Sequence, residues 1–225
     1  MKNLLIVACG LMSASCGHSR LVPAADAQIV PDATDAAYAV ADGVRVVVSL
    51  GDQEGLAREV PGDVAPIKVR VVNHGARPVS ILYDHLNLRG RRGHRYRAIP
   101  AVPLEHAKLA RALAPIRPCF ASSNFQVAGR YHDLYPQLDP WPAPLLRDES
   151  VYERAYLSWS DHPPDREVVR MALPEGVLGP QGEITGYVYF ERPTSSESSL
   201  TFDATLVSAS NVSEVSSVRI PLRME

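Results

Sequence analysis

The chain has 225 residues, of which 46% are hydrophobic and 21% charged, and its formal net charge is -2. These values are near the average for soluble globular proteins, so they exclude a chain disordered throughout, a coiled coil and a polytopic membrane protein. The sequence pI is near 6.4, so the chain lacks the excess of basic residues that is typical of nucleic-acid-binding proteins. Proline outnumbers glycine, at 19 against 14, which disfavours a mainly helical protein.

The N-terminus has the order of residues found in a secretory signal. Lys2 precedes a short apolar run over residues 4–12, which cannot span a bilayer because that needs about 20 apolar residues. Small residues at 13–15 then lead directly to Cys16. This order resembles a bacterial lipoprotein signal, whose cysteine thiolate accepts the lipid and becomes the first residue of the mature chain.

Cys16 is one of two cysteines that could accept a lipid. Cys9 follows the better small-residue motif, Ile6-Val7-Ala8, and Ser13 stands where the family usually has leucine. We favour Cys16 because only eight residues precede Cys9, which leaves a cramped apolar segment. Two alternatives remain: a signal removed by a soluble-type peptidase, and an N-terminal helix buried in the fold.

The resemblance to lipoproteins also implies a location. Residues 1–15 are then a signal peptide, and acyl chains such as palmitate hold the mature chain at the membrane of a bacterial cell envelope. The residue after Cys16 is Gly17, where an aspartate would mark retention in the inner membrane of enterobacteria. The resemblance therefore implies an outer-membrane lipoprotein.

Residues 16–42 are rich in alanine, aspartate and proline, and no apolar period persists in them. This composition predicts a flexible tether. The pattern changes at residue 43, and we expect a single domain over residues 43–225.

Alternation of apolar and polar residues predicts a series of short strands in this domain. The expected strands lie at 44–49, 67–73, 79–83, 86–88, 94–99, 184–190, 200–206 and 215–222, with turns at 73–75, 89–93 and 178–182. Short strands separated by turn signals predict a mainly β protein built as an antiparallel β-sandwich.

Residues 101–172 do not fit this strand pattern and predict a long, partly helical insertion. A helix is expected at 104–113, between Pro103 and Pro115, and another at 150–159, which ends before Pro163-Pro164. The segment between them is rich in proline and aromatic residues. No internal repeat of fixed period is found.

The insertion holds eight of the fifteen aromatic residues of the chain. Tyrosine and tryptophan bury a large area while keeping a polar tip, which suits them to interfaces. The candidate partner-binding residues are Tyr131, Trp141, Tyr152, Tyr156 and Trp159. The alternative is that these side chains pin a loop-rich segment onto the sandwich.

A second cluster is basic and surrounds the predicted turn at 89–93. It consists of Arg89, Arg91, Arg92, Arg95 and Arg97, together with His94. Such a loop could bind phosphate groups or a polyanion such as lipopolysaccharide. The alternative is a solvated hairpin, whose charges guard sheet edges against pairing.

The motifs of common active sites are not found in the sequence. There is no G-x-S-x-G, no S-x-x-K and no phosphate-binding loop, and no histidine pair has the spacing of a zinc helix. Cys119 is expected to be a buried, inert thiol. We therefore assign no catalytic, cofactor-binding or metal-binding residue.

Five stretches of the sequence carry a broader resemblance. They are residues 64–73, 78–83, 95–100, 172–178 and 186–190. In outline the chain resembles uncharacterised bacterial envelope lipoproteins with one immunoglobulin-like β-sandwich. The resemblance implies a non-enzymatic binding or structural interaction module, with an envelope protein or a glycan as partner. The alternatives are a periplasmic or surface hydrolase and an accessory subunit of an envelope or secretion assembly.

Overall fold

The structure is a computed structural model that describes residues 20–51, 60–101, 122–145, 152, 159, 164–209 and 214–225. Cys16 and the signal, Cys119 and Tyr156 lie outside the described residues. The helix expected at 104–113 also lies outside them, and so does the one expected at 150–159, apart from Tyr152 and Trp159.

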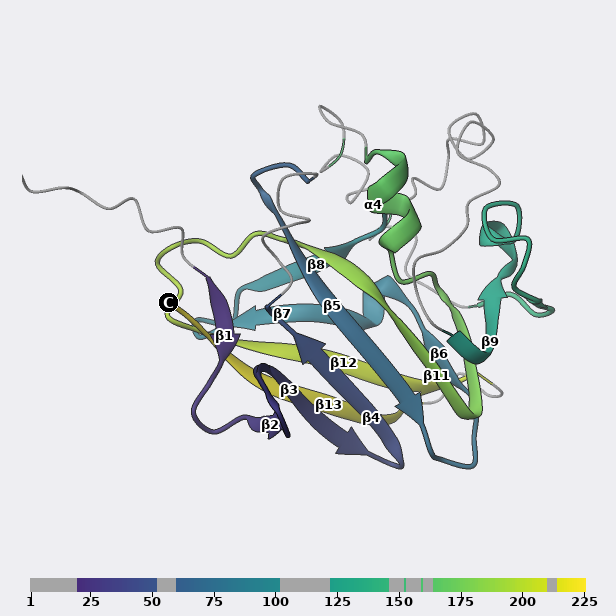
Figure 1. Ribbon diagram of the computed structural model, residues 1–225, viewed down its shortest axis with the longest axis horizontal. Coiled ribbons are helices and arrows are strands. Elements are labelled where there is room, and N and C mark those ends of the chain that lie inside the picture. The colour runs from purple at the N-terminus through teal and green to yellow at the C-terminus, as the bar shows by residue number, and fades with distance from the viewer. Residues whose placement is uncertain are drawn as a thin grey trace, which may run out of the picture.

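The described residues form a mainly β protein with one large antiparallel sheet (Figure 1). One half of the sheet has the order β1 (Leu21–Pro23), β13 (Glu214–Met224), β12 (Ser199–Ser208), β7 (Leu86–Gly90) and β8 (Arg95–Ile99). The other half continues with β11 (Gly176–Glu191), β5 (Val64–Asn73), β4 (Val44–Ser49), β3 (Ala33–Ala41) and β2 (Gln28–Val30).

Shorter elements lie beside this path. Strand β6 (Val79–Ile81) pairs with β11 and β12, β9 (Ser122–Ala128) pairs with β11, and β10 (Pro140–Trp141) runs parallel to β9. The helical elements whose bounds the structure describes are the 3-10 turns η1 (Tyr83–His85) and η2 (Gly129–Tyr131) and the helix α4 (Arg166–Met171). Figure 1 shows β3, β4 and β5 crossing in front of β7, β12 and β13.

The core forms where the apolar faces of the two halves meet. Along β4, buried Val44, Val46 and Val48 alternate with residues that are only half-buried, as period-two patterning requires. Phe190 of β11 and Phe202 of β12 meet edge to face, with ring centroids 6.1 Å apart. The strands expected from alternation are therefore found, with β5 starting earlier than expected and the 79–83 strand giving way to η1 at Tyr83.

The turn expected at 178–182 is wrong, because these residues belong to β11. The pairing between β11 and β9 shifts register between Leu178 and Glu183, and Gln181 has a φ of 59°. A large bulge explains both observations, since the four residues 179–182 of β11 stand against the single residue Asn124 of β9, which kinks the strand without ending it. The glycines and proline of this stretch mark a bend within one long strand.

The flexible tether expected over residues 16–42 is also wrong for residues 21–41, which form β1, β2 and β3. Ala36 to Ala41 pair with β4 through a tight turn at Asp42 and Gly43, whose φ angles are 48° and 77°. Leu21 and Ala37 are buried in the core. The alanine-rich β3 and the short β1 are stable as strands because β4 and β13 supply their hydrogen-bonding partners.

The long helical insertion expected over 101–172 is not seen in the described residues. This region instead contributes β9, η2, β10 and the short helix α4. Strand β9 pairs with the edge of β11 opposite to β5 and β6, where Gly176 lies opposite Val127 and Ile184 lies opposite Ser122. The backbone groups of β11 are thereby paired along its first residues.

A substitution in the turn between β3 and β4 tests whether β3 belongs to the folded domain. A Cβ on Gly43 would lie 2.9 Å from Gly75 Cα, and the positive φ disfavours any side chain. We expect Gly43→Ala to lower the free energy of unfolding by about 2 kcal/mol or more, measured by urea denaturation. Gly62→Ala is the control, because nothing lies within 4 Å of that Cβ, and it should change stability by less than about 0.5 kcal/mol. Equal stabilities of the two variants would contradict the ordered β3–β4 hairpin.

Candidate functional site

Three of the five candidate partner-binding residues are buried. Tyr131, Tyr152 and Trp159 are 3%, 5% and 2% exposed, while Trp141 in β10 is half-buried. Side chains this deep can reach a partner only if the core opens. Packing, rather than recognition, therefore describes these three aromatic residues.

Two of these aromatic residues, Tyr131 and Tyr152, lie beside a buried ion pair between Arg130 of η2 and Glu175, which directly precedes β11. The Glu175 carboxylate accepts hydrogen bonds from the Tyr83 N–H at 2.9 Å and from the Tyr152 hydroxyl. The Arg130 guanidinium lies over the rings of Tyr131 and Tyr152, at 4.8 and 4.5 Å from their centroids. We call these five residues the Arg130–Glu175 cluster.

The Arg130–Glu175 cluster has a structural role, because it holds separate segments of the chain together. A buried carboxylate is costly unless a cation and hydrogen-bond donors compensate it, and Glu175 has both. Its donors come from η1, from η2 and from Tyr152, so one carboxylate fixes three separate segments against the start of β11.

Tyrosine hydroxyls attach the helix α4 to the sheet. Tyr135 donates to the Val169 carbonyl at 2.9 Å, and Tyr189 of β11 donates to the Val168 carbonyl at 2.8 Å. The carbonyls in the last turn of a helix need partners, and here tyrosines supply additional donors. Tyr83 similarly donates to the Leu173 carbonyl at 2.6 Å. Each hydroxyl is used to position backbone.

Burial changes the acidity of these tyrosines. Desolvation raises the pKa of Tyr83 well above 10.0, and the neighbouring tyrosines raise it further. Desolvation is also the main cause of the raised pKa values of Tyr135 and Tyr189. All three hydroxyls therefore stay protonated and remain hydrogen-bond donors across the physiological range.

Sequence reasoning missed Arg130 and Glu175, and it counted Tyr135 among the aromatic residues of the insertion without making it a candidate. The signal for Glu175 was its place as a single acidic residue among apolar neighbours in residues 172–178, which favours burial with a partner. Arg130 directly precedes a candidate aromatic, but it lies 45 residues from Glu175. Only the fold brings the two together.

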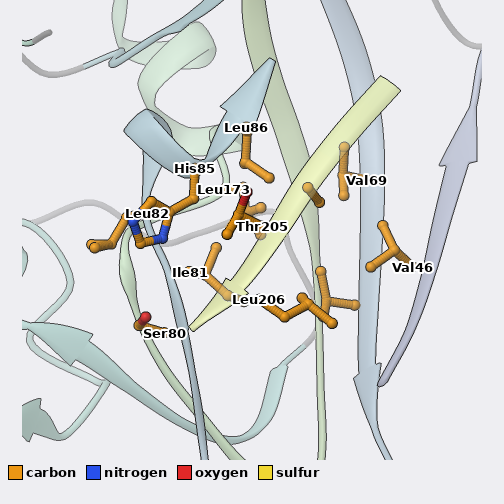
Figure 2. A pocket seen from close by; sticks show the side chains of 12 residues that line it. Val46, Val69, Ser80, Ile81, Leu82, His85, Leu86, Leu173, Thr205 and Leu206 are labelled. Atoms are coloured by element: carbon orange, nitrogen blue, oxygen red, sulfur yellow. The ribbon is translucent and has the colours of Figure 1, made fainter. Parts of the chain in front are cut away.

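A small apolar cavity lies between the two halves of the sheet (Figure 2). Its volume is about 20 Å³, and Val46, Val69, Leu206 and His85 are among the residues that line it. This is space for a single water molecule and not for a substrate. Among the described residues, His85 Nδ1 finds no hydrogen-bond partner, and its Nε2 lies 3.7 Å from Asp84 Oδ1.

The basic cluster lies on the hairpin formed by β7 and β8, as the sequence indicated. The Gly90 N–H donates to the His94 carbonyl at 2.8 Å and closes the turn. The arginines that the sequence singled out are all exposed. This cluster is therefore accessible, unlike the aromatic one.

Two further properties concern only the described part of the chain. In these ranges no group of three or more metal-binding side chains comes together. No helix within them is long and apolar enough to cross a membrane. Comparison of the chain with family models, curated proteins and solved structures finds no match.

The two tryptophans of the chain separate packing from recognition. Trp159 packs edge to face on Tyr189 and donates from Nε1 to the Pro100 carbonyl at 2.9 Å. We expect Trp159→Ala to cost about 3–5 kcal/mol of folding free energy, measured by thermal or urea unfolding. Trp141→Ala is the matched control and should cost clearly less, because Trp141 is only half-buried. A stable Trp159→Ala protein would contradict the packing role.

The buried tyrosines predict how stability depends on pH. Because their pKa values are raised in the folded state, their contribution is complete below about pH 10 and is lost as the pH rises beyond it. Wild type should exceed Tyr135→Phe by about 1 kcal/mol at neutral pH, through the bond to Val169.

This difference should shrink above about pH 10, in urea titrations followed by circular dichroism, since only wild type can ionise this hydroxyl on unfolding. Phe190→Leu, a buried position without a hydroxyl, should show a constant difference from wild type. A constant difference for Tyr135→Phe would overturn the explanation.

Proposed function

We propose that this chain is a lipid-anchored protein of the bacterial cell envelope, most simply of the outer membrane, whose β domain is a binding or structural interaction module. The observation that carries the proposal is the position of Cys16. It ends a signal-like apolar run, and the first strand, β1, begins only five residues later at Leu21. This order supports an acylated cysteine that directly precedes a folded domain.

We further propose that the two facing halves of the sheet form an immunoglobulin-like β-sandwich. The antiparallel pairing and the shared core support this class, and so does the edge-to-face contact of Phe190 with Phe202 between the halves. Such sandwiches serve many interaction modules, although the fold alone assigns no ligand.

A structural or binding role is favoured by how the polar groups of the interior are used. The Glu175 carboxylate, which is 1% exposed, is compensated by Arg130 and by donors from Tyr83 and Tyr152. The buried tyrosine hydroxyls donate to backbone carbonyls. These groups fix the segment around α4 and η2 onto the sheet, which makes a rigid scaffold for an envelope protein or glycan partner.

Replacement of Cys16 tests the proposal. We expect the full chain to incorporate radiolabelled palmitate in cells and to fractionate with membranes, and Cys16→Ser to lose both properties. Cys9→Ser and Cys119→Ser are the matched controls, and both should keep the label if Cys16 is the acylated residue. A wild-type protein without lipid label, found in the soluble fraction, would contradict the proposal. Loss of label in Cys9→Ser alone would move the site to Cys9.

A further inference from the structure

The outer face of the half-sheet β13–β12–β7–β8 is dominated by arginine. Two rows of paired residues cross it, and both point away from the core because their strand neighbours Phe202, Leu88 and Ile220 are buried. One row runs Arg219, Asp203, Asn87, Arg97, and the other runs Pro221, Thr201, Arg89, Arg95.

Other cations extend these rows. Arg91 and Arg92 lie exposed in the turn after β7, and Arg223 lies exposed on β13. We define the arginine face by its seven members, Arg89, Arg91, Arg92, Arg95, Arg97, Arg219 and Arg223.

Acidic groups only partly neutralise the arginine face. Asp203 Oδ2 lies 2.9 Å from Arg89 Nε, and its Oδ1 lies 3.5 Å from Arg219 Nε, while Arg223 pairs with Glu225. At the rim, Glu191 and Glu197 accept backbone N–H bonds from Arg97 and Arg91, both at 3.3 Å. Seven cations therefore meet four carboxylates.

The side chains of four of these arginines form no ion pair within the described part of the chain. Among the described residues, no carboxylate oxygen lies within 4.0 Å of a side-chain nitrogen of Arg91, Arg92, Arg95 or Arg97. The whole chain has 23 basic and 25 acidic residues, so positive charge is concentrated here in a chain that is net acidic. A face of this kind attracts an anionic surface.

Strand β1 connects this face to the segment that begins at Cys16, the proposed lipid site. Strand β1 lies beside β13 (Figure 1), and Val22 pairs with Arg223. From Cys16 to Leu21 the chain spans at most about 18 Å when fully extended. A lipid on Cys16 would therefore hold the edge of the arginine face close to the bilayer that contains the lipid.

We infer that the arginine face docks on the anionic phospholipid headgroups of the membrane in which the Cys16 lipid is inserted. This inference rests on the proposed function. Guanidinium groups bind phosphate oxygens in pairs and are less strongly hydrated than ammonium groups, which suits an extended arginine surface to a phosphate-rich one. A lipid chain and a basic patch together hold a protein more firmly than either alone. The domain then lies with β13, β12, β7 and β8 towards the membrane and β4 and β5 away from it.

The first experiment reads the orientation of the lipidated full chain. The protein is reconstituted into vesicles of phosphatidylcholine alone, or of phosphatidylcholine with about one third phosphatidylglycerol, and treated with an arginine-selective dicarbonyl reagent. Mass spectrometry should find Arg95, Arg97 and Arg219 at least about fivefold less modified on the anionic vesicles. Arg70, exposed on β5, should react equally on both. Equal modification of Arg97 on the two vesicles overturns the inference, and so does equal protection of Arg70.

The second experiment separates docking from lipidation. The full chain with Cys16→Ser is added to preformed anionic vesicles, and its partition is measured by co-sedimentation at low and high salt. Adding Arg95→Ser and Arg97→Ser should lower the partition coefficient about tenfold, since each arginine near an anionic surface contributes to binding. Adding Arg70→Ser and Arg166→Ser, two exposed positions on β5 and α4, is the matched control and should leave it unchanged.

The two proposals fail in different ways. If Cys16 carries no lipid, the wild-type chain does not label with palmitate, whereas the effect of Arg95→Ser and Arg97→Ser on anionic vesicles still reports on the face. If the face does not dock, labelling persists and both pairs of substitutions behave alike. Protection of Arg97 by inorganic phosphate or soluble lipopolysaccharide without vesicles, equal to that on anionic vesicles, would assign the face to soluble anions and overturn membrane docking.

Discussion

Strand β11 hydrogen bonds to four other strands along its 16 residues, and most of the structure is attached through it. Buried backbone groups need partners on both edges of such a strand. Strand β5 satisfies one edge over ten residues and β6 continues that edge at Gly176–Leu178, while β8 and β9 pair with the other edge. The two halves are joined by the short pairing of β8 with Tyr189 and Phe190, and also by β6, which pairs with both β11 and β12. Loss of β11 would break the connection between the halves.

The polar interior is organised around the beginning of the same strand. Glu175 directly precedes β11, and the buried Leu173 lies two residues before it. Burying an ion pair gains little net stability because both charges lose water, but removing one partner leaves a costly charge behind. The Arg130–Glu175 cluster therefore contributes mainly to the conformational specificity of the fold, since it favours one arrangement of η1, η2 and Tyr152 against the sheet.

The parts of the fold that were predictable are those whose signal is local. Alternation along β4 and β12, and the glycine-containing turn before His94, depend on neighbours in sequence. Strand β3 was not predicted because its alanines have weak strand propensity and its stability comes from pairing with β4. The Asp42-Gly43 pair that follows it is nevertheless a strong hairpin signal. The aromatic residues were noticed, but sequence alone left packing and recognition open. Because Tyr131, Tyr152 and Trp159 are buried, their role is packing. The partnership of Arg130 with Glu175 has no local signal, since only the tertiary fold brings them together.

The pairing of the N-terminal strand has a mechanical consequence. Arg20 and Glu225 exchange both of their backbone hydrogen bonds, each at 2.8 Å, and β1 follows with three paired residues on β13. A pulling force applied between residues 20 and 225 would enter and leave the domain at adjacent points. The short β1–β13 ladder would bear that load, and the core would lie outside its path. Strand β1 would separate from β13 first. This would lengthen the chain between the two points of force, while β4, β5, β11 and β12 kept their pairing.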